Sequence, residues 1–276
     1  MTQPTVTFIG GGNMARAIYG GLLESGFTAK NITVVDPSTA AQDTARQAGV
    51  ELVFDAAPNE ALHADLIVLA VKPQIIKAAL TPLAGRVGPK AFILSIVAGI
   101  NAQSLAALLG LIDTRLIIRC MPNTPALVGE GMTGLYANAE AGSAEGKTLA
   151  ERVMSSVGQC VWVNNESDLD VITAISGSGP AYFFLFIESL TDAAIELGMD
   201  DESARKLALQ TALGASRLAS QSREDAATLR ENVTSPGGTT EKAIQAFEAS
   251  DIRGIVARAA QAAARRSVEL SKEFGV

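Results

Sequence analysis

Cysteine and histidine are scarce in this sequence, and their scarcity excludes several kinds of site. Two cysteines, Cys120 and Cys160, occur in 276 residues. Their spacing fits no zinc or redox motif, and a disulfide framework requires more of them. We therefore expect two reduced thiols, as in a cytosolic protein. The single histidine, His63, precedes an apolar run, and we interpret it as a surface residue. One histidine without clustered carboxylates predicts that there is no metal site.

Positive charge and long apolar runs are also lacking. The formal net charge is −7, so the surface repels phosphate backbones and we expect no nucleic-acid partner. The longest apolar runs, such as residues 66–71, have the length of a strand and fall far short of the roughly 20 residues of a membrane helix. The N-terminus shows no basic, apolar leader. We therefore expect a cytoplasmic protein without membrane association.

Hydrophobic residues are abundant, at 48% of the sequence, which is enough for the cores of two domains. In the first half, short runs rich in Val and Ile lack polar alternation, which indicates strands covered on both faces. Strand and helix alternate, which predicts a doubly wound, mainly parallel α/β sheet. We expect strands at 5–9, 32–35, 66–71, 91–96, 116–120, 134–136 and 160–163. We expect helices between them at 13–25, 39–47, 74–84 and 102–109.

Strand signals end near residue 167, and the rest of the chain has helical patterns. Gly198 and Asp200 suit the end of one helix and the cap of the next. Helix 181–197 is apolar on nearly every side, and such a helix has to be covered by other elements. We therefore predict a sheet domain at 1–164 and an all-α dimerisation domain at 165–276. The helices expected there are 181–197, 201–221, 224–231, 241–248 and 252–274.

The segment G-G-G-N-M-A at 10–15 is a G-x-G-x-x-A motif between a predicted strand and a predicted helix. In this context Gly10 permits a tight turn, Gly12 lets the backbone approach a pyrophosphate, and Ala15 keeps the helix close to the strand. The N–H groups and the dipole of the helix would face the phosphates. We therefore expect Rossmann-type dinucleotide binding in preference to an ordinary glycine-rich turn. The cofactor contacts expected here are Gly10, Gly12, Asn13 and Met14.

Asp36 ends the next predicted strand. An acidic side chain at this place usually binds the ribose hydroxyls of the adenosine and favours NAD. Its charge would repel the additional phosphate of NADP. Ser38, Thr39 and Arg46 could still meet that phosphate if the loop bends. The sequence therefore leaves NAD, NADP or both as cofactors.

Two further strands end in segments that we expect at the cofactor, A-V-K-P at 70–73 and V-A-G at 97–99. Ligands of open α/β sheets bind at the carboxyl ends of the strands. Lys72 is therefore a candidate contact, and the alternative is a solvated lysine before a helix that begins with proline. The contacts expected at these two strand ends are Ala70, Lys72, Pro73, Ala98 and Gly99.

Two segments of the second half are rich in small and hydroxyl residues. S-G-S-G-P-A-Y at 176–182 precedes a helix that we expect to begin at or near Pro180. It is either a tight entry to a buried helix or a place where backbone approaches the nicotinamide. N-V-T-S-P-G-G-T-T at 232–240 predicts an anion nest of N–H groups that binds a carboxylate without arginine. The alternative is an empty loop in which Thr240 is the N-cap.

These motifs together resemble those of the pyrroline-5-carboxylate reductases. The resemblance implies an enzyme that uses NADPH or NADH to reduce a cyclic imine, Δ1-pyrroline-5-carboxylate, to L-proline in the last step of proline biosynthesis. It also implies a helical domain that intertwines with its dimer mate, and some members form pentamers of dimers. The matching elements, in order along nearly the whole chain, are F-I-G-G-G-N-M-A at 8–15, A-V-K-P at 70–73, R-C-M-P-N-T-P at 119–125, S-G-S-G-P-A-Y at 176–182 and T-S-P-G-G-T-T at 234–240.

The resemblance also implies roles for individual residues at the substrate. Thr240 would be the catalytic contact at the ring nitrogen. Ser235, Gly238 and Thr239 would hold the carboxylate.

Four further positions follow from the same resemblance. Asn232 and Glu166 match positions that contact or support the proline site. Asn59 matches an asparagine that contacts the cofactor. Relatives often have serine where this chain has Asp36, so their usual preference for NADPH is not carried over.

The implied reaction needs little from side chains. A protonated C=N bond is already electrophilic, so hydride addition depends mainly on positioning. The lack of a candidate catalytic histidine argues against dehydrogenases of 2-hydroxy acids, which need a base. Two alternatives stay open. One is a reductase of another small cyclic imino acid, and the other is a non-catalytic NAD(P) sensor, which would have no use for a second anion nest.

Overall fold

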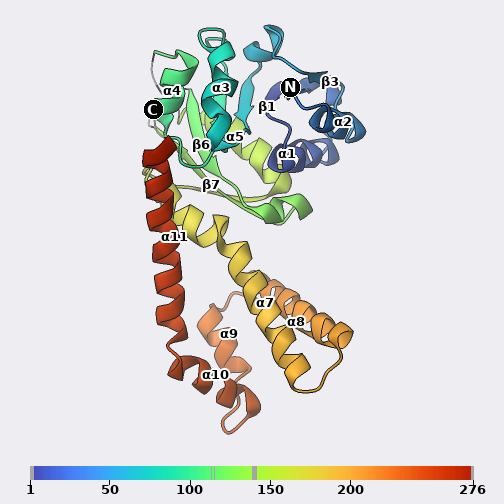
Figure 1. The fold of residues 1–276 in the computed structure, drawn as a ribbon, viewed down its shortest axis with the longest axis vertical. Coiled ribbons are helices and arrows are strands. Elements are labelled where there is room, and N and C mark those ends of the chain that lie inside the picture. The colour runs from blue at the N-terminus through green and yellow to red at the C-terminus, as the bar shows by residue number, and fades with distance from the viewer. Residues whose placement is uncertain (1–2, 113, 115, 139–141, 275–276) are drawn as a thin grey trace. The chain divides into compact units, whose positions relative to one another are not determined.

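The structure is a computed structural model that describes residues 3–112, 114, 116–138 and 142–274. Its chain forms two compact units (Figure 1). The sheet unit consists of residues 1–178 and 263–276, and the helical unit consists of residues 179–262. The end of the chain therefore belongs to the same unit as its beginning. The boundary predicted between residues 164 and 165 stays a prediction.

One sheet of eight strands forms the centre of the sheet unit, in the order β3-β2-β1-β4-β5-β6-β7-β8. Neighbouring strands are parallel except β6 and β7. Val6 of β1 pairs with Ile32 of β2 on one side and with Leu66 of β4 on the other. The predicted fold class is thereby confirmed. The strands are β1 Val6–Ile9, β2 Ile32–Val35, β3 Leu52–Phe54, β4 Leu66–Leu69, β5 Phe92–Ser95, β6 Ile117–Met121, β7 Gly131–Ala137 and β8 Gly158–Trp162.

The central strands lack polar alternation because both faces of the sheet are covered. Val6 and Phe8 of β1 belong to one buried cluster, whereas Ile9 belongs to another. Because successive side chains of a strand point to opposite faces, each cluster is the core on one face. Helices α1 Asn13–Glu24, α2 Thr39–Gln47 and α5 Ala144–Met154 pack on the first face. Helices α3 Ile76–Leu80 and α4 Ala102–Leu109 pack on the second (Figure 1).

Several elements of the sheet unit differ from the predicted ones. The single helix predicted at 74–84 is wrong, because α3 has only five residues and a 3-10 turn lies on each side of it. Pro82 cannot donate a helical hydrogen bond, which explains the interruption. The structure adds α5 and the edge strand β3, which were not predicted. β3 has three residues, and its Leu52 and Phe54 are exposed, so it carries too little hydrophobic pattern to be recognised.

The segment 176–182 leads into α7 as predicted, because this helix begins at Gly179, next to Pro180. The first residues of the segment belong to a π-helical turn, in which the Ser178 N–H donates to the carbonyl oxygen of Thr173 at 2.8 Å. A β-carbon on Gly177 would lie 2.7 Å from Cε of Met121. The small residue therefore allows the helix to pack closely on β6. The three successive elements are α6 Asp168–Ile172, the π-helical turn Thr173–Gly177 and α7 Gly179–Glu196.

The helical unit has the helices expected from the sequence. Asp200 caps α8 as predicted, since its Oδ1 accepts the N–H of Ser203 at 3.0 Å. Phe186 of α7 and Phe247 of α10 pack with their ring centroids 6.0 Å apart. The last helix begins in this unit and ends in the sheet unit. The helices after α7 are α8 Asp201–Gln221, α9 Ala226–Asn232, α10 Thr239–Ala249 and α11 Ile252–Phe274.

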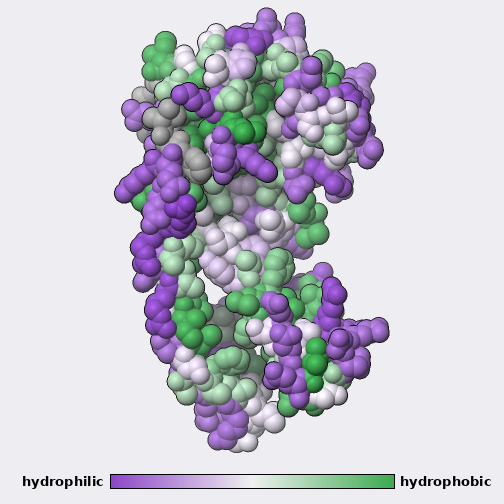
Figure 2. All heavy atoms as spheres, viewed as in Figure 1, coloured by the Kyte–Doolittle hydropathy of each residue, from purple (hydrophilic) through white to green (hydrophobic). Residues whose placement is uncertain are grey.

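The apolar side chains of α7 are largely exposed in the single chain. Phe183, Phe184 and Leu185 are 65%, 64% and 63% exposed, and Figure 2 shows hydrophobic residues at the surface of the helical unit. By length and composition alone, the helix Asp168–Glu196 could cross a membrane. This is weak evidence, because core helices of soluble proteins pass the same test. Exposed apolar surface of this kind also marks protein–protein interfaces.

Candidate active site

The glycine loop between β1 and α1 packs very closely against the end of β4. Gly10 has a φ of +101°, and a β-carbon there would lie 2.6 Å from the carbonyl oxygen of Ala70. The Gly10 N–H donates to Val35 O, and the Ala70 N–H donates to Ile9 O, both at 2.8 Å. Only glycine fits both the conformation and the contact. The carboxyl ends of β1, β2 and β4 are thus joined at one edge of the sheet.

The start of α1 is open at this edge. Gly12 is the N-cap residue, its backbone is extended, and no side chain caps the helix there. The first helical bond runs from the Arg16 N–H to Gly12 O at 2.9 Å. A β-carbon on Gly12 would meet no heavy atom within 4 Å, which leaves space beside the first turn, where Asn13 and Met14 lie. Free N–H groups at a helix N-terminus beside open space fit the pyrophosphate of a dinucleotide.

Asp36 is fixed at the end of β2 by two backbone N–H groups. Its Oδ2 accepts from Gly11 at 2.7 Å and its Oδ1 accepts from Ser38 at 2.8 Å. The carboxylate therefore joins the glycine loop to the turn before α2. Arg46, the only basic residue between positions 36 and 46, forms an ion pair with Asp43 at 3.1 Å. The expected adenosine end of the site thus carries a fixed negative charge.

Asn59 lies in the turn before β4, and its side-chain oxygen is already bound. Oδ1 accepts from Arg86 Nη2 at 2.8 Å and from Arg86 Nε at 3.2 Å. Arg86 also donates to the carbonyl oxygen of Ala57 at 3.1 Å. This orientation leaves Nδ2 as the group of Asn59 that could serve a cofactor. The exposed His63 lies beside it, with Nδ1 2.8 Å from Asn59 O, which agrees with the prediction of a surface residue.

The segments after β4 and β5 lie at the same edge. β4 and β5 are paired in parallel, and the Ile96 N–H donates to Leu69 O at 3.1 Å where the two strands end. Ala70 and Ala98 are partly buried in these segments, whereas Lys72 is exposed. The expected cofactor residues of these two segments, Ala70, Lys72, Pro73, Ala98 and Gly99, therefore occupy neighbouring strand ends.

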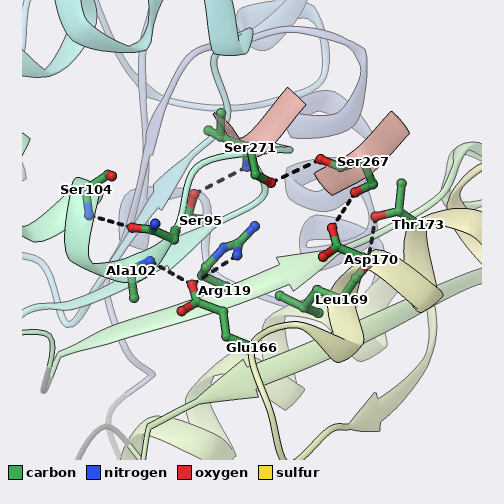
Figure 3. Close-up of polar contacts among 12 residues, drawn as sticks. Ser95, Ala102, Ser104, Arg119, Glu166, Leu169, Asp170, Thr173, Ser267 and Ser271 are labelled. Atoms are coloured by element: carbon green, nitrogen blue, oxygen red, sulfur yellow. Dashed lines mark hydrogen bonds and ion pairs between the residues drawn. The ribbon is translucent and has the colours of Figure 1, made fainter. Parts of the chain in front are cut away.

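Glu166 lies in the sheet unit, where it binds the start of α4 (Figure 3). Its Oε1 accepts the N–H of Ala102 at 2.7 Å and Nη1 of Arg119 at 3.0 Å. The two charged side chains are 30% and 13% exposed, respectively. The carboxylate is therefore held by a guanidinium and by the positive end of a helix. Arg119 and Ala102 were not singled out from the sequence, because their contact with Glu166 spans at least 47 residues.

The 232–240 segment of the helical unit forms a turn and the first turn of α10. Gly238, not Thr240, is the N-cap, and no side chain caps the helix there. The Gly238 N–H donates to Ser235 O at 3.0 Å, and Glu241 turns back to accept the Gly237 N–H at 2.9 Å. The side chains of Ser235, Thr239 and Thr240 are exposed. The alternative in which Thr240 caps the helix is therefore wrong.

The position of Asn232 differs from the expected loop position. It is the last residue of α9, and its Nδ2 donates to Oε2 of Glu224 at 2.9 Å. The side chain therefore links the last residue of α9 to Glu224, which lies just before that helix.

The cysteines lie in the sheet and have no disulfide partner among the residues that the structure describes. Burial raises the pKa of the Cys120 thiol far above its usual range. Burial also raises the pKa of the half-buried Cys160 thiol. Both groups are therefore protonated and poor nucleophiles at neutral pH. In the same described residues, no three His, Cys, Asp or Glu side chains form a candidate metal site.

The predicted site residues fall into two sets. All the expected cofactor residues lie in the sheet unit, and all the expected substrate residues except Glu166 lie in the helical unit. The first set combines a glycine loop, an open helix N-terminus and an acidic residue at the end of β2, as in Rossmann-type nucleotide-binding domains. The second set combines N–H groups and hydroxyls at a helix N-terminus, which suits a carboxylate. Fold and site define a nicotinamide-dinucleotide oxidoreductase with a helical second unit.

Comparisons with known proteins identify the family within this class. Residues 166–270 match the family described as pyrroline-5-carboxylate reductase dimerisation, and residues 5–99 match the one described as NADP oxidoreductase coenzyme F420-dependent. The chain is 45% identical to the pyrroline-5-carboxylate reductase of Pseudomonas aeruginosa, with 100% of both chains covered. It is 41% identical to that of Pasteurella multocida, covering 99% of this chain and 100% of the relative.

Solved structures agree with these relatives. The pyrroline-5-carboxylate reductase of Coxiella burnetii superimposes with a TM-score of 0.89 at 40% identity, covering 98% of this chain and 99% of the other. The enzyme of Plasmodium falciparum, solved with NADP bound, gives 0.83 at 31% identity with the same coverage. The chain belongs to the pyrroline-5-carboxylate reductase family. It is therefore an NAD(P)H-dependent oxidoreductase that acts on a small molecule and oligomerises.

Two glycine substitutions test the glycine loop. Gly10→Ala should lower the free energy of unfolding by about 2–4 kcal/mol, because the β-carbon overlaps Ala70 and the backbone is left-handed.

Gly12→Ala should leave the free energy of unfolding unchanged within about 1 kcal/mol. It should raise the dissociation constant of the dinucleotide about tenfold or more, because the added methyl group obstructs the pyrophosphate. Urea unfolding and calorimetric titration with NADH and NADPH measure both. Normal dinucleotide binding by Gly12→Ala would place the pyrophosphate elsewhere.

Proposed function

We propose that this protein reduces Δ1-pyrroline-5-carboxylate to L-proline by hydride transfer from NADH or NADPH, the last step of proline biosynthesis. The observation that carries the proposal is the combination of two N–H-rich helix starts in one chain of this family. One, at Gly12, suits a pyrophosphate, and the other, at Gly238, suits a carboxylate. A sensor of the dinucleotide alone would have no use for the second.

The chain's own groups mainly orient the substrate. We propose that the first backbone N–H groups of α10, which follow the N-cap Gly238, and the hydroxyls of Ser235 and Thr239 bind the carboxylate, and that Thr240 contacts the ring nitrogen. Asn232 lies where this turn begins, and its Nδ2 is bound to Glu224. The reduced nicotinamide supplies the hydride, and the protonated imine is electrophilic without an additional acid. Catalysis then depends on orientation, which accounts for several kcal/mol of barrier in favourable cases.

We propose that Asp36 and Ser38 lie at the adenosine ribose, with Asn59 further along the dinucleotide. The N–H groups of Gly11 and Ser38 hold the Asp36 carboxylate at the end of β2, and an acidic side chain at such a strand end disfavours the additional phosphate of NADP. This geometry supports use of NADH. NADP in the Plasmodium falciparum relative supports NADPH as a second substrate.

The proposed reaction is tested by following oxidation of NADH and of NADPH, separately, after addition of Δ1-pyrroline-5-carboxylate, with proline detected as the product. Turnover with either dinucleotide supports the proposal. Binding of dinucleotide without turnover on this substrate would contradict it. A parallel assay with a six-membered cyclic imine then separates another imino-acid reductase from a sensor, which turns over neither.

Thr240→Ala should lower kcat about 100-fold, as expected when one preorganised hydrogen-bonding side chain is removed from a transition state. The dissociation constants of NADH and NADPH should stay within about twofold, because Thr240 belongs to the substrate set. Steady-state kinetics and calorimetry measure the two effects. Thr240→Ser, which retains the hydroxyl, is the matched control and should recover most of the rate. Weaker dinucleotide binding at an unchanged kcat would contradict this role.

Asp36→Ser should shift the ratio of kcat/KM for NADH to that for NADPH towards NADPH by about tenfold or more. Removing a repulsion of about 1.4 kcal/mol already has this effect. Arg46→Ala is the control and should leave the ratio nearly unchanged, since Arg46 is paired with Asp43. An unchanged ratio in Asp36→Ser would show that the carboxylate does not face the additional phosphate.

We also propose that the protein is a cytoplasmic homodimer formed through its C-terminal helices. Family membership and the exposed phenylalanines of α7 support the dimer, and the two free thiols suit a reducing compartment. Phe184→Asp should convert the dimer into monomers, because a charge buried in an apolar interface is strongly unfavourable. Sedimentation velocity measures the change, with Glu145→Gln on the sheet unit as the control. A monomeric wild-type protein would contradict the dimer, and a larger assembly would extend it.

A further inference from the structure

The loop that joins β5 to α4, residues 96–101, places some of its residues in the core and others at the surface. Val97 and Ile100 are buried in the core on the second face of the sheet. Ala98 is partly buried, and Gly99 is buried. The β5–α4 loop lies at the carboxyl end of β5, where open α/β sheets bind ligands. Ala98 is therefore a residue through which the loop can reach a cofactor.

The element that covers Gly99 is the end of α11. Residues 263–274 of this helix belong to the sheet unit, as the loop does. Gly99 has a φ of +75°, and a β-carbon there would lie 3.3 Å from the carbonyl carbon of Leu270 and 3.4 Å from the backbone nitrogen of Ser271. Because both atoms belong to the helix backbone, they cannot swing aside as a side chain can. The position of α11 therefore determines where this part of the loop lies.

The end of α11 is in turn tied to α6. Ser267 is buried, and its Oγ donates to Oδ1 of Asp170 at 2.6 Å (Figure 3). This length is typical of a hydroxyl that donates to a carboxylate. Ser267 precedes Leu270 by about one helical turn. The hydrogen bond therefore holds the helix next to the place where it contacts Gly99.

A close contact of its own fixes α6 on the sheet. A β-carbon on Gly134 of β7 would lie 2.7 Å from Cγ2 of Ile172, the last residue of α6. Asp170 is two residues earlier in the same helix. A continuous series of contacts thus runs from the sheet through α6 and the end of α11 to the β5–α4 loop.

We propose that Asp170 and Ser267 are positioning residues for the nicotinamide dinucleotide, acting through the end of α11 and the β5–α4 loop. This inference rests on the proposed function, since it assigns the loop to the dinucleotide. Without the hydrogen bond, the end of α11 can shift, and its backbone no longer holds Gly99 in place. Ala98 then moves with Gly99. The dinucleotide binds less tightly, because the loop has to be ordered when it binds.

Ser267→Ala tests the inference because it removes the hydroxyl without interrupting the helix. The dissociation constants of NADH and NADPH, measured by calorimetry without substrate, should rise about fivefold, as for loss of one hydrogen bond. The KM for Δ1-pyrroline-5-carboxylate at saturating dinucleotide should stay within about twofold. Thr148→Ala is the matched control and should change none of these values. It removes an exposed hydroxyl of α5 that donates to the carbonyl oxygen of Ala144 in its own helix.

A double-mutant cycle tests whether the two residues act as a pair. Asp170→Ala should raise the same dissociation constants by a similar factor. Adding Ser267→Ala to Asp170→Ala should then change them by less than about twofold, because the interaction is already lost. Asp170→Asn keeps an acceptor for the hydroxyl and should retain most of the affinity. Effects of the two alanine substitutions that multiply would overturn the proposed pair.

Two further outcomes would overturn the inference. A lower melting temperature of Ser267→Ala with unchanged dissociation constants would leave the hydrogen bond a purely structural role. A higher KM for the imine with unchanged dinucleotide binding would place its effect at the substrate. The dinucleotide titration needs no turnover, so it decides the inference even if the protein reduces no imine. Failure of the proposed reaction and failure of this inference are therefore distinguishable.

Discussion

The site depends on one close contact, that between Gly10 and the carbonyl of Ala70. The carboxyl ends of β1 and β4 approach so closely that a β-carbon on Gly10 would lie 2.6 Å from this oxygen. Because the two turns meet, α1 can begin at Gly12 with its first N–H groups facing open space. The ends of β2 and β5 are joined to this edge by their own backbone hydrogen bonds. A dinucleotide site of this kind is therefore a consequence of backbone packing before any side chain contributes.

The polar side chains around this edge mostly hold the backbone in place. Asp36 accepts from Gly11 and Ser38, and the side-chain oxygen of Asn59 accepts from Arg86. Glu166 accepts from Ala102 and Arg119. Groups whose own orientation is fixed by such bonds hold a ligand in one geometry without reorganisation. This suits a reaction in which the substrate is already electrophilic and positioning is the main requirement.

The two units are joined by helices. The chain leaves the sheet unit after a π-helical turn and returns within α11. π-Helical turns are rare and occur often at functional sites, and here the turn packs on β6 through Gly177 and Met121. The end of α11 contacts the β5–α4 loop at Gly99. The end of α11, which belongs to the sheet unit, therefore packs against a loop that carries the expected cofactor residue Gly99.

Features that depend on short stretches of chain were predictable from the sequence. The glycine motif at 10–15, the parallel strands around it and the cap of α8 by Asp200 follow from local patterns, and the structure confirms them. The turn at 232–240 was also recognisable, although Gly238 and not Thr240 is its N-cap.

Tertiary structure decided which groups the polar side chains bind. It also decided the presence of elements whose sequences have little hydrophobic pattern. The role of Glu166 could not be read locally, because Arg119 is 47 residues away along the chain. The start of α7 near Pro180 was predicted, whereas α6 and the π-helical turn before it were not, and Gly134 and Gly177 leave room for these helical turns against the sheet. β3 is recognisable only by its pairing with β2. Local propensity determines where elements begin, whereas contacts between distant segments determine which side chains face a ligand and which hold the backbone.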